Sequence, residues 1–108
     1  AFATYARCRD YIEENRMTLR EIREVAQACH VDESYMCRLF QRFGRERPFQ
    51  YLQHLRMNHA AAALQFRPCL IKDLAVELGF SDAANFTRAF RRWFGVPPQK
   101  LRTGHPAG

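Results

Sequence analysis

Arginine side chains gather in two short stretches of the chain. The first, 38–47, contains four arginines and one acid, Glu46, and the second begins beyond Asp82, the last acidic residue. The basic residues of the two stretches are Arg38, Arg42, Arg45, Arg47, Arg88, Arg91, Arg92, Lys100 and Arg102. The whole chain has 17 Lys and Arg against 11 Asp and Glu, a formal net charge of +6. Two separate basic clusters on a small domain indicate a polyanionic partner, and the alternative is a solvated face that aids solubility.

No other combination of residues predicts chemistry. The chain has no nucleophile–base pair, no glycine-rich phosphate loop and no paired catalytic carboxylates, so we expect no enzyme activity. His54 and His59 are five residues apart, which is poor spacing for shared metal ligation. The cysteines form no C-x-x-C pair, so neither a metal site nor a cofactor is expected; they are Cys8, Cys29, Cys37 and Cys69. Cys37, beside Arg38, leaves a redox-sensing thiol open as a minor alternative.

Length and composition predict one small globular domain. The chain has 108 residues, of which 47% are hydrophobic and 26% are charged, and this argues against disorder. No apolar run approaches the roughly 18 residues of a membrane span, and no signal peptide opens the chain. Scattered cysteines suit a reducing cytosol. The chain starts at Ala1 without an initiator Met, so we expect a piece of a longer polypeptide.

Apolar residues recur every three or four positions along the whole chain, and no stretch alternates with period two. The pattern predicts an all-α fold of about seven helices. They are expected over 3–15, from Thr18, over 33–43, over 49–66, over 71–78, from Asp82 to about 94, and over 98–101. Thr18 with Glu21 has the spacing of a capping box, and Asp32 and Asp82 are expected N-caps. Phe49 and Trp93 are expected to face inward.

The chain contains the same unit twice. Residues 32–43, DESYMCRLFQRF, align with residues 82–93, DAANFTRAFRRW, at a constant offset of 50. Asp, Arg, Phe and Arg are identical at four of these positions, and each segment follows a short amphipathic helix and a tight break. This repeat predicts two helix-turn-helix units joined by a long helix over 48–66. The turn residues are His30 and Gly79, and because His30 tolerates a positive φ poorly, the first turn is expected to be irregular.

The second unit, IKDLAVELGFSDAANFTRAFRRWFGVPPQKLR, resembles the C-terminal signature of AraC/XylS-type transcription regulators. The residues that carry the resemblance are Ala75, Gly79, Phe80, Ser81, Asp82, Phe86, Arg88, Phe90, Phe94, Gly95, Val96 and Pro98. The first unit is similar to the other half of that domain through Ser34, Tyr35, Met36, Arg38, Leu39, Phe40, Tyr51, Leu52, Leu55 and Arg56. It departs from the family pattern at His30, where glycine is usual, and over 44–48.

The resemblance implies the organisation and the biological setting. It implies an AraC-type DNA-binding domain over 1–102, with a first lobe over 5–47, a connecting helix over 48–66 and a second lobe over 67–102. A disordered tail is expected over 103–108. Family members are mostly bacterial cytoplasmic activators, often with a separate effector-binding domain. We therefore expect double-stranded DNA and RNA polymerase as partners, and an effector-binding domain that is missing from this chain.

A helix-turn-helix unit places the N-terminal part of its second helix against base edges in the major groove. Once the buried stripe is removed, the base-contact candidates are Ser34, Tyr35, Cys37, Arg38, Ala83, Ala84, Asn85, Thr87 and Arg88. Arg38 and Arg88 are the best candidates because a guanidinium pairs bidentately with guanine, and Asn85 has the groups to contact adenine. The alternative for either arginine is a phosphate contact. The phosphate-contact candidates are Gln41, Arg42, Arg45, Arg47, Arg91 and Arg92.

The connecting helix predicts the spacing of the two recognition helices. Eighteen residues span roughly 27 Å, against roughly 34 Å between successive major-groove segments on one DNA face. We therefore expect both helices to enter successive segments, with bending of the DNA. Two other classes of function remain open: a helical protein-interaction module with an acidic partner, and a domain that coats nucleic acid without sequence preference.

Overall fold

The computed structural model describes residues 1–102, and within that range every regular element is helical. The elements are α1 (Phe2–Glu14), α2 (Arg23–Ala28), α3 (Glu33–Leu39), the π-helical segment η1 (Phe40–Gly44), α4 (Pro48–Phe66), α5 (Ile71–Glu77), α6 (Ala83–Phe94) and α7 (Pro98–Leu101). The prediction of an all-α fold with about seven helices is confirmed. The tail expected over 103–108 lies outside the described residues. No helix within residues 1–102 is long and apolar enough to cross a membrane.

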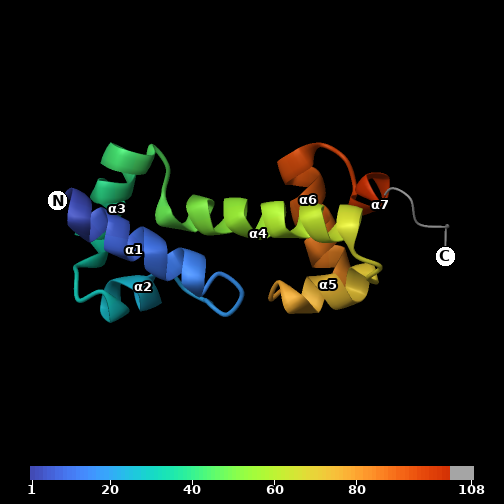
Figure 1. Ribbon diagram of the computed structural model, residues 1–108, viewed down its shortest axis with the longest axis horizontal. Coiled ribbons are helices and arrows are strands. Elements are labelled where there is room, and N and C mark those ends of the chain that lie inside the picture. Colours follow the sequence, from blue (N-terminus) through green and yellow to red (C-terminus); the bar gives the residue numbers. More distant parts are fainter. Residues whose placement is uncertain (103–108) are drawn as a thin grey trace. The chain divides into compact units, whose positions relative to one another are not determined.

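Within residues 1–102 the chain divides into two compact units, the first Ala1–Leu55 and the second beginning at Arg56. The boundary falls inside α4, which is a single helix of 19 residues. In the first unit α1 packs against α2, α3 and η1, and in the second α6 packs against α5 and α7 (Figure 1). Each unit thus contains one pair of short helices joined by a tight turn, α2–α3 and α5–α6.

The core of the first unit forms around one face of α1. Tyr5, Cys8 and Ile12 recur along this face and are buried. The other buried members of the core are Leu19, Val25, Ala26, Cys29, Met36, Leu39, Phe40 and Leu52. The Tyr5 ring packs edge-on against Phe40, with ring centroids 4.9 Å apart. Burial of these side chains holds the short helices α2 and α3, which are too short to be stable alone.

The third predicted helix of this unit, expected over 33–43, ends differently. It is α-helical only to Leu39 and continues as the π-helical η1 to Gly44. A Cβ at Gly44 would lie 2.8 Å from the Tyr5 hydroxyl, so close packing against Tyr5 demands glycine there. The residue with positive φ is the next one, Arg45, at 58°.

The core of the second unit contains a row of phenylalanines on α6. Phe86 and Phe90 are fully buried, and their ring centroids lie 5.7 Å apart. Phe94, which is 36% exposed, packs against the end of this row, with its ring centroid 4.6 Å from that of Phe90. The remaining buried apolar residues of this unit are Met57, Ala60, Ala63, Leu64, Leu74, Ala75 and Leu78. Small residues at 60 and 63 permit close helix contacts on that face of α4.

The expectation that Phe49 and Trp93 face inward is wrong. Phe49 is 54% exposed because Pro48 and Leu52, four residues apart, occupy the buried stripe of α4. Trp93 is 41% exposed and its neighbour Phe94 is 36% exposed, because the buried stripe of α6 ends at Phe90.

The expected capping box at Thr18 is also wrong. The Thr18 hydroxyl donates to the carbonyl oxygen of Asn15 at 3.2 Å, inside the turn that follows α1, and so caps nothing downstream. The N-cap of α2 is Ile22. The carboxylate of Glu24 accepts from the backbone N–H of Glu21 at 3.1 Å, so an acidic side chain satisfies a free amide at this end instead.

Candidate nucleic-acid interface

The first recognition helix, α3, is fixed at its start by Asp32. The Asp32 carboxylate accepts from the backbone N–H of Tyr35 at 3.1 Å, as predicted for an N-cap. Met36 and Leu39 are buried on the inner face. Ser34, Tyr35 and Arg38 are therefore exposed on the outer face, and Cys37 is half-buried.

The second recognition helix, α6, begins in the same way. The Asp82 carboxylate accepts from the backbone N–H of Asn85 at 2.8 Å. Because Phe86 and Phe90 face inward, the outer face exposes the residues Ala84, Arg88, Arg91 and Arg92. Ala83, Asn85 and Thr87 are half-buried. Within each unit, the sequence-predicted base-contact candidates therefore share one end of a capped helix.

The turns before the two recognition helices close with matching hydrogen bonds. In the first unit the Val31 N–H donates to the carbonyl of Ala26 at 3.0 Å, and in the second the Phe80 N–H donates to the carbonyl of Ala75 at 2.9 Å. The residue before each donor has a positive φ, 58° at His30 and 87° at Gly79. The expected irregularity at the first turn is therefore wrong: His30 adopts the left-handed conformation, although glycine adopts it at lower cost.

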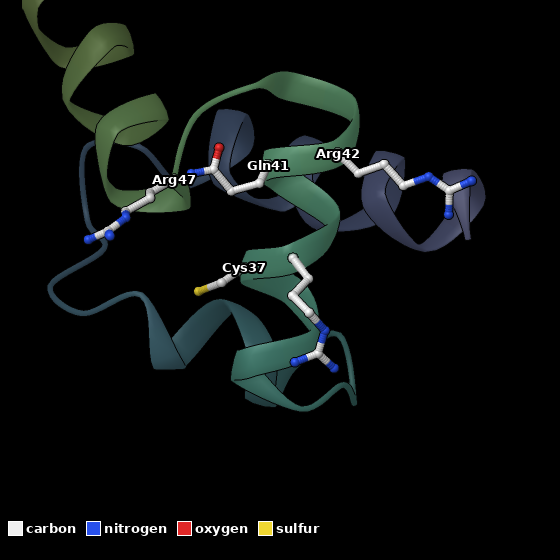
Figure 2. Close-up of a pocket in the computed structure, with 5 residues that line it drawn as sticks. Cys37, Gln41, Arg42 and Arg47 are labelled. Carbon is white, nitrogen blue, oxygen red and sulfur yellow. The ribbon is translucent and has the colours of Figure 1, made fainter.

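A basic hollow lies beside α3 and η1 in the first unit. It is lined by Cys37, Arg38, Gln41, Arg42 and Arg47. Figure 2 shows Cys37, Gln41 and Arg47 on one side of the segment, whereas the Arg42 guanidinium extends away from Cys37. The hollow has three arginines and no acid in its lining, so its field attracts anions such as phosphate.

Burial makes the Cys37 thiol a poor redox sensor. Burial raises the pKa of Cys37 above its ordinary 9.0, and the nearby Glu33 carboxylate raises it further, against an opposing effect of Arg47. The thiolate is the reactive form of cysteine. A raised pKa leaves little thiolate near pH 7, which weakens the redox alternative for this residue.

The basic residues of the recognition faces are not neutralised by acids. The ion pairs within residues 1–102 join Arg9 to Asp10 and Glu13, Arg23 to Glu21, and His59 and Arg67 to Glu77. None of them involves the predicted contact arginines, which are Arg38, Arg42, Arg45, Arg47, Arg88, Arg91 and Arg92. Their positive charge therefore remains available to a polyanion.

Sequence reasoning missed one member of this region, Ser81. Its hydroxyl accepts from the side-chain amide of Asn85, and the amide oxygen of Asn85 accepts from the Arg88 guanidinium. These residues are spaced by four and by three, which places their side chains next to one another along a helix. That spacing is the signal for Ser81 in the sequence, although Ser81 precedes the first residue of α6, Ala83.

Comparisons with known proteins point to one family. Residues 25–104 match the model of a helix-turn-helix domain family. The chain is 34% identical over 100 residues to an uncharacterized HTH-type transcriptional regulator, YijO, of Escherichia coli K12, covering 93% of this chain and 35% of that protein. The chain thus spans about a third of the length of this relative.

Two solved structures have the same fold. One is a transcriptional regulator from Chromobacterium violaceum described as containing an AraC-type DNA-binding domain, with a TM-score of 0.86 at 23% identity, covering 98% of this chain and 96% of that one. The other is the DNA-binding domain of AdpA, a global transcriptional factor, solved in complex with a target DNA. Its TM-score is 0.84 at 20% identity, covering 97% of this chain and 98% of that one.

Proposed function

The chain belongs to the AraC-type helix-turn-helix family of transcription regulators, in which it is the DNA-binding domain, and we propose that it binds a specific double-stranded sequence through two recognition helices, α3 and α6. The family is one of DNA-binding domains and not of enzymes. The two helices enter successive major-groove segments on one face of the duplex.

One observation carries this proposal: the chain presents the same capped helix twice, each time with an exposed arginine that has no acidic partner among residues 1–102. Arg38 and Arg88 lie at the same position of the repeat, six residues after the capping aspartate. A helix that serves only to pack would not need a cation at this outward position in both copies. A guanidinium near the start of a recognition helix has the geometry for guanine contact.

The remaining candidates divide by their distance from the start of the helix. On α3, the proposed base contacts besides Arg38 are Ser34 and Cys37, and on α6, besides Arg88, they are Ala83, Ala84 and Thr87. The other two predicted candidates, Tyr35 and Asn85, each lie beside one of the two arginines. The proposed phosphate contacts are Gln41, Arg42, Arg45, Arg47, Arg91 and Arg92. The basic hollow beside η1 supports the assignment for the first unit. The small side chains at 83 and 84 supply few polar groups, so direct contact with bases is weaker for α6.

The length of α4 supports binding to successive groove segments. Its 19 residues span about 28 Å as a helix, somewhat less than the roughly 34 Å between such segments. We propose that the DNA bends to meet both helices, at a free-energy cost that depends on its sequence.

The setting is proposed from the relatives. The chain spans about a third of the length of the regulator from Escherichia coli, and an effector-binding domain outside this chain is the proposed remainder. Activation through contact with RNA polymerase, in a bacterial cytoplasm, is proposed for the whole protein.

The test is selection of bound duplexes from a random library at about 150 mM salt, a concentration at which nonspecific binding is weak. The proposal predicts an asymmetric motif of two blocks about 10 base pairs apart. Absence of any motif, with an affinity that follows salt concentration alone, would instead establish a coating domain. Absence of DNA binding would favour the protein-interaction module.

A further inference from the structure

The position three residues before each recognition arginine differs between the two units. It is Tyr35 before Arg38 and Asn85 before Arg88, and the offset of 50 makes them equivalent positions of the repeat. In a helix, residues three apart are neighbours on the surface. In both units the side chain at this position contacts the arginine, although by different chemistry.

In the second unit the contact is a chain of hydrogen bonds. The Arg88 Nη2 donates to the Asn85 amide oxygen, and the Asn85 amide nitrogen donates to the Ser81 hydroxyl. Recognition of adenine by asparagine requires both of these amide groups to face one base edge. In this structure the amide oxygen of Asn85 faces Arg88 and the amide nitrogen faces Ser81. The observed conformation of Asn85 therefore holds Arg88 and does not present the amide to a base.

In the first unit the contact is with an aromatic ring. The guanidinium carbon of Arg38 lies 5.8 Å from the centre of the Tyr35 ring, a cation–π distance. The ring is 38% exposed, on the outer face of α3. A ring face restricts the direction of the guanidinium without using any of its five N–H donors.

Restricting a free arginine before it binds lowers the entropy lost on binding. The single hydrogen bond to Asn85 leaves four N–H donors of Arg88 for a bidentate contact. We propose that Tyr35 and Asn85, the latter with Ser81, are positioning residues that hold the base-contacting guanidiniums of Arg38 and Arg88, an inference that rests on the proposed function of these arginines.

The test for the second unit is a double-mutant cycle of Asn85→Ala and Arg88→Ala, measured as duplex affinity and base preference by library selection. The Asn85→Ala variant keeps the N-cap, because the bond to Asp82 comes from the backbone N–H of residue 85. We expect it to weaken binding about 2- to 10-fold, the range for ordering one long side chain, and to blur the motif at the base position of Arg88. In the Arg88→Ala background the same change should have almost no effect.

An additive effect of Asn85→Ala in both backgrounds, with loss of an adenine preference, would show that Asn85 contacts a base and would overturn the inference while leaving the proposed function standing. If Arg88→Ala itself leaves the motif unchanged, this result would refute both the proposed base contact of Arg88 and the proposed positioning of Arg88 by Asn85. Ser81→Ala should act in the same direction as Asn85→Ala and more weakly, because it leaves the Arg88 contact in place. A Ser81→Ala effect larger than that of Asn85→Ala would contradict this arrangement of hydrogen bonds, in which Asn85 contacts Arg88 and Ser81 contacts Asn85.

The test for the first unit uses a matched pair at Tyr35. Tyr35→Phe keeps the ring and should retain the wild-type motif, whereas Tyr35→Ala removes the ring and should blur the position contacted by Arg38. Equal losses from both substitutions would assign the effect to the hydroxyl, make Tyr35 a direct contact, and overturn its positioning role.

Discussion

The two helix-turn-helix units need the left-handed backbone at equivalent places but meet this need with different residues. In the second unit the positive φ angles belong to glycines, 87° at Gly79 and 81° at Gly95. In the first unit they belong to His30 and Arg45, both at 58°. Because a residue with a Cβ adopts this conformation at a cost of about 1–2 kcal/mol, the first unit stores strain at two points where the second does not.

The comparison shows that the turn is imposed by the hydrogen bonds and the core of each unit and not by the turn residue. It also indicates that a residue with a side chain occupies a strained position where that side chain has a function. Arg45 is exposed and lies beside the basic hollow in sequence, between Arg42 and Arg47. A strained residue at a functional surface is a common combination, and it supports Arg45 as a phosphate contact.

The largest expected effect tests whether both units depend on equivalent core positions. Met36 and Phe86 lie 50 residues apart and are both fully buried. Met36→Ala should lower the free energy of unfolding by about 2–5 kcal/mol and Phe86→Ala by about 3–5 kcal/mol, because each leaves a cavity. Urea denaturation measures both. A loss well under 1 kcal/mol in either variant would contradict the equivalence of the two cores.

Substitution of the turn residue should change the stability in opposite directions in the two units. No atom lies within 4 Å of the position of a Cβ added to Gly79, so Gly79→Ala is penalised by its backbone alone. We expect a loss of about 1–2 kcal/mol of stability. His30→Gly should instead gain up to about 1 kcal/mol, because it relieves the same strain. Thermal denaturation of the two variants decides this, and a loss of stability in His30→Gly would show that the His30 side chain contributes more than its strain costs.

Substitution of Arg45 should have opposite effects on stability and on DNA binding. Arg45→Gly should raise the free energy of unfolding by up to about 1 kcal/mol through relief of strain. It should also weaken duplex binding and lower the slope of log affinity against log salt by about 0.9, the value for one phosphate contact. His30→Gly is the matched control, since it relieves equivalent strain outside the proposed contact set. An unchanged salt slope in Arg45→Gly would remove Arg45 from the phosphate contacts.

The smallest expected effect concerns pH. The hydrogen bond from His59, followed by that from Arg67, holds the pKa of Glu77 below its ordinary 4.5. A depressed carboxyl pKa stabilises the fold above the unfolded pKa, and this contribution is lost as the pH falls below 4.5 through the folded pKa. By the offset of 49 that relates Ala26 to Ala75 and His30 to Gly79, the equivalent residue of the first unit is the uncharged Ala28.

Glu77→Gln should therefore reduce stability at pH 7 by about 0.2–1 kcal/mol, the range for an exposed pair, and by less at pH 3. Denaturation at the two pH values measures the difference. An equal loss at both would mean that the carboxylate charge is not what stabilises this contact.

Much of the fold could be predicted because local signals agreed with the packing. Asp32 and Asp82 have the cap geometry expected from their types, and Gly79 has the expected positive φ. The incorrect predictions concern features that depend on how side chains pack. The π-helical segment η1 ends at Gly44, which packs closely against Tyr5, a residue 39 positions away in sequence. The spacing of Ser81, Asn85 and Arg88 brings these side chains next to one another, but the hydrogen bonds among them depend on rotamers that the sequence does not specify.

The central claim is that each unit contacts its own part of a two-block DNA site. Library selection with Arg38→Ala and Arg88→Ala in parallel tests it most directly. The account predicts that each substitution weakens a different block, at about 1–3 kcal/mol of lost discrimination, and leaves the other block intact. Weakening of the same block by both substitutions, or a uniform loss of affinity with the motif unchanged, would contradict it.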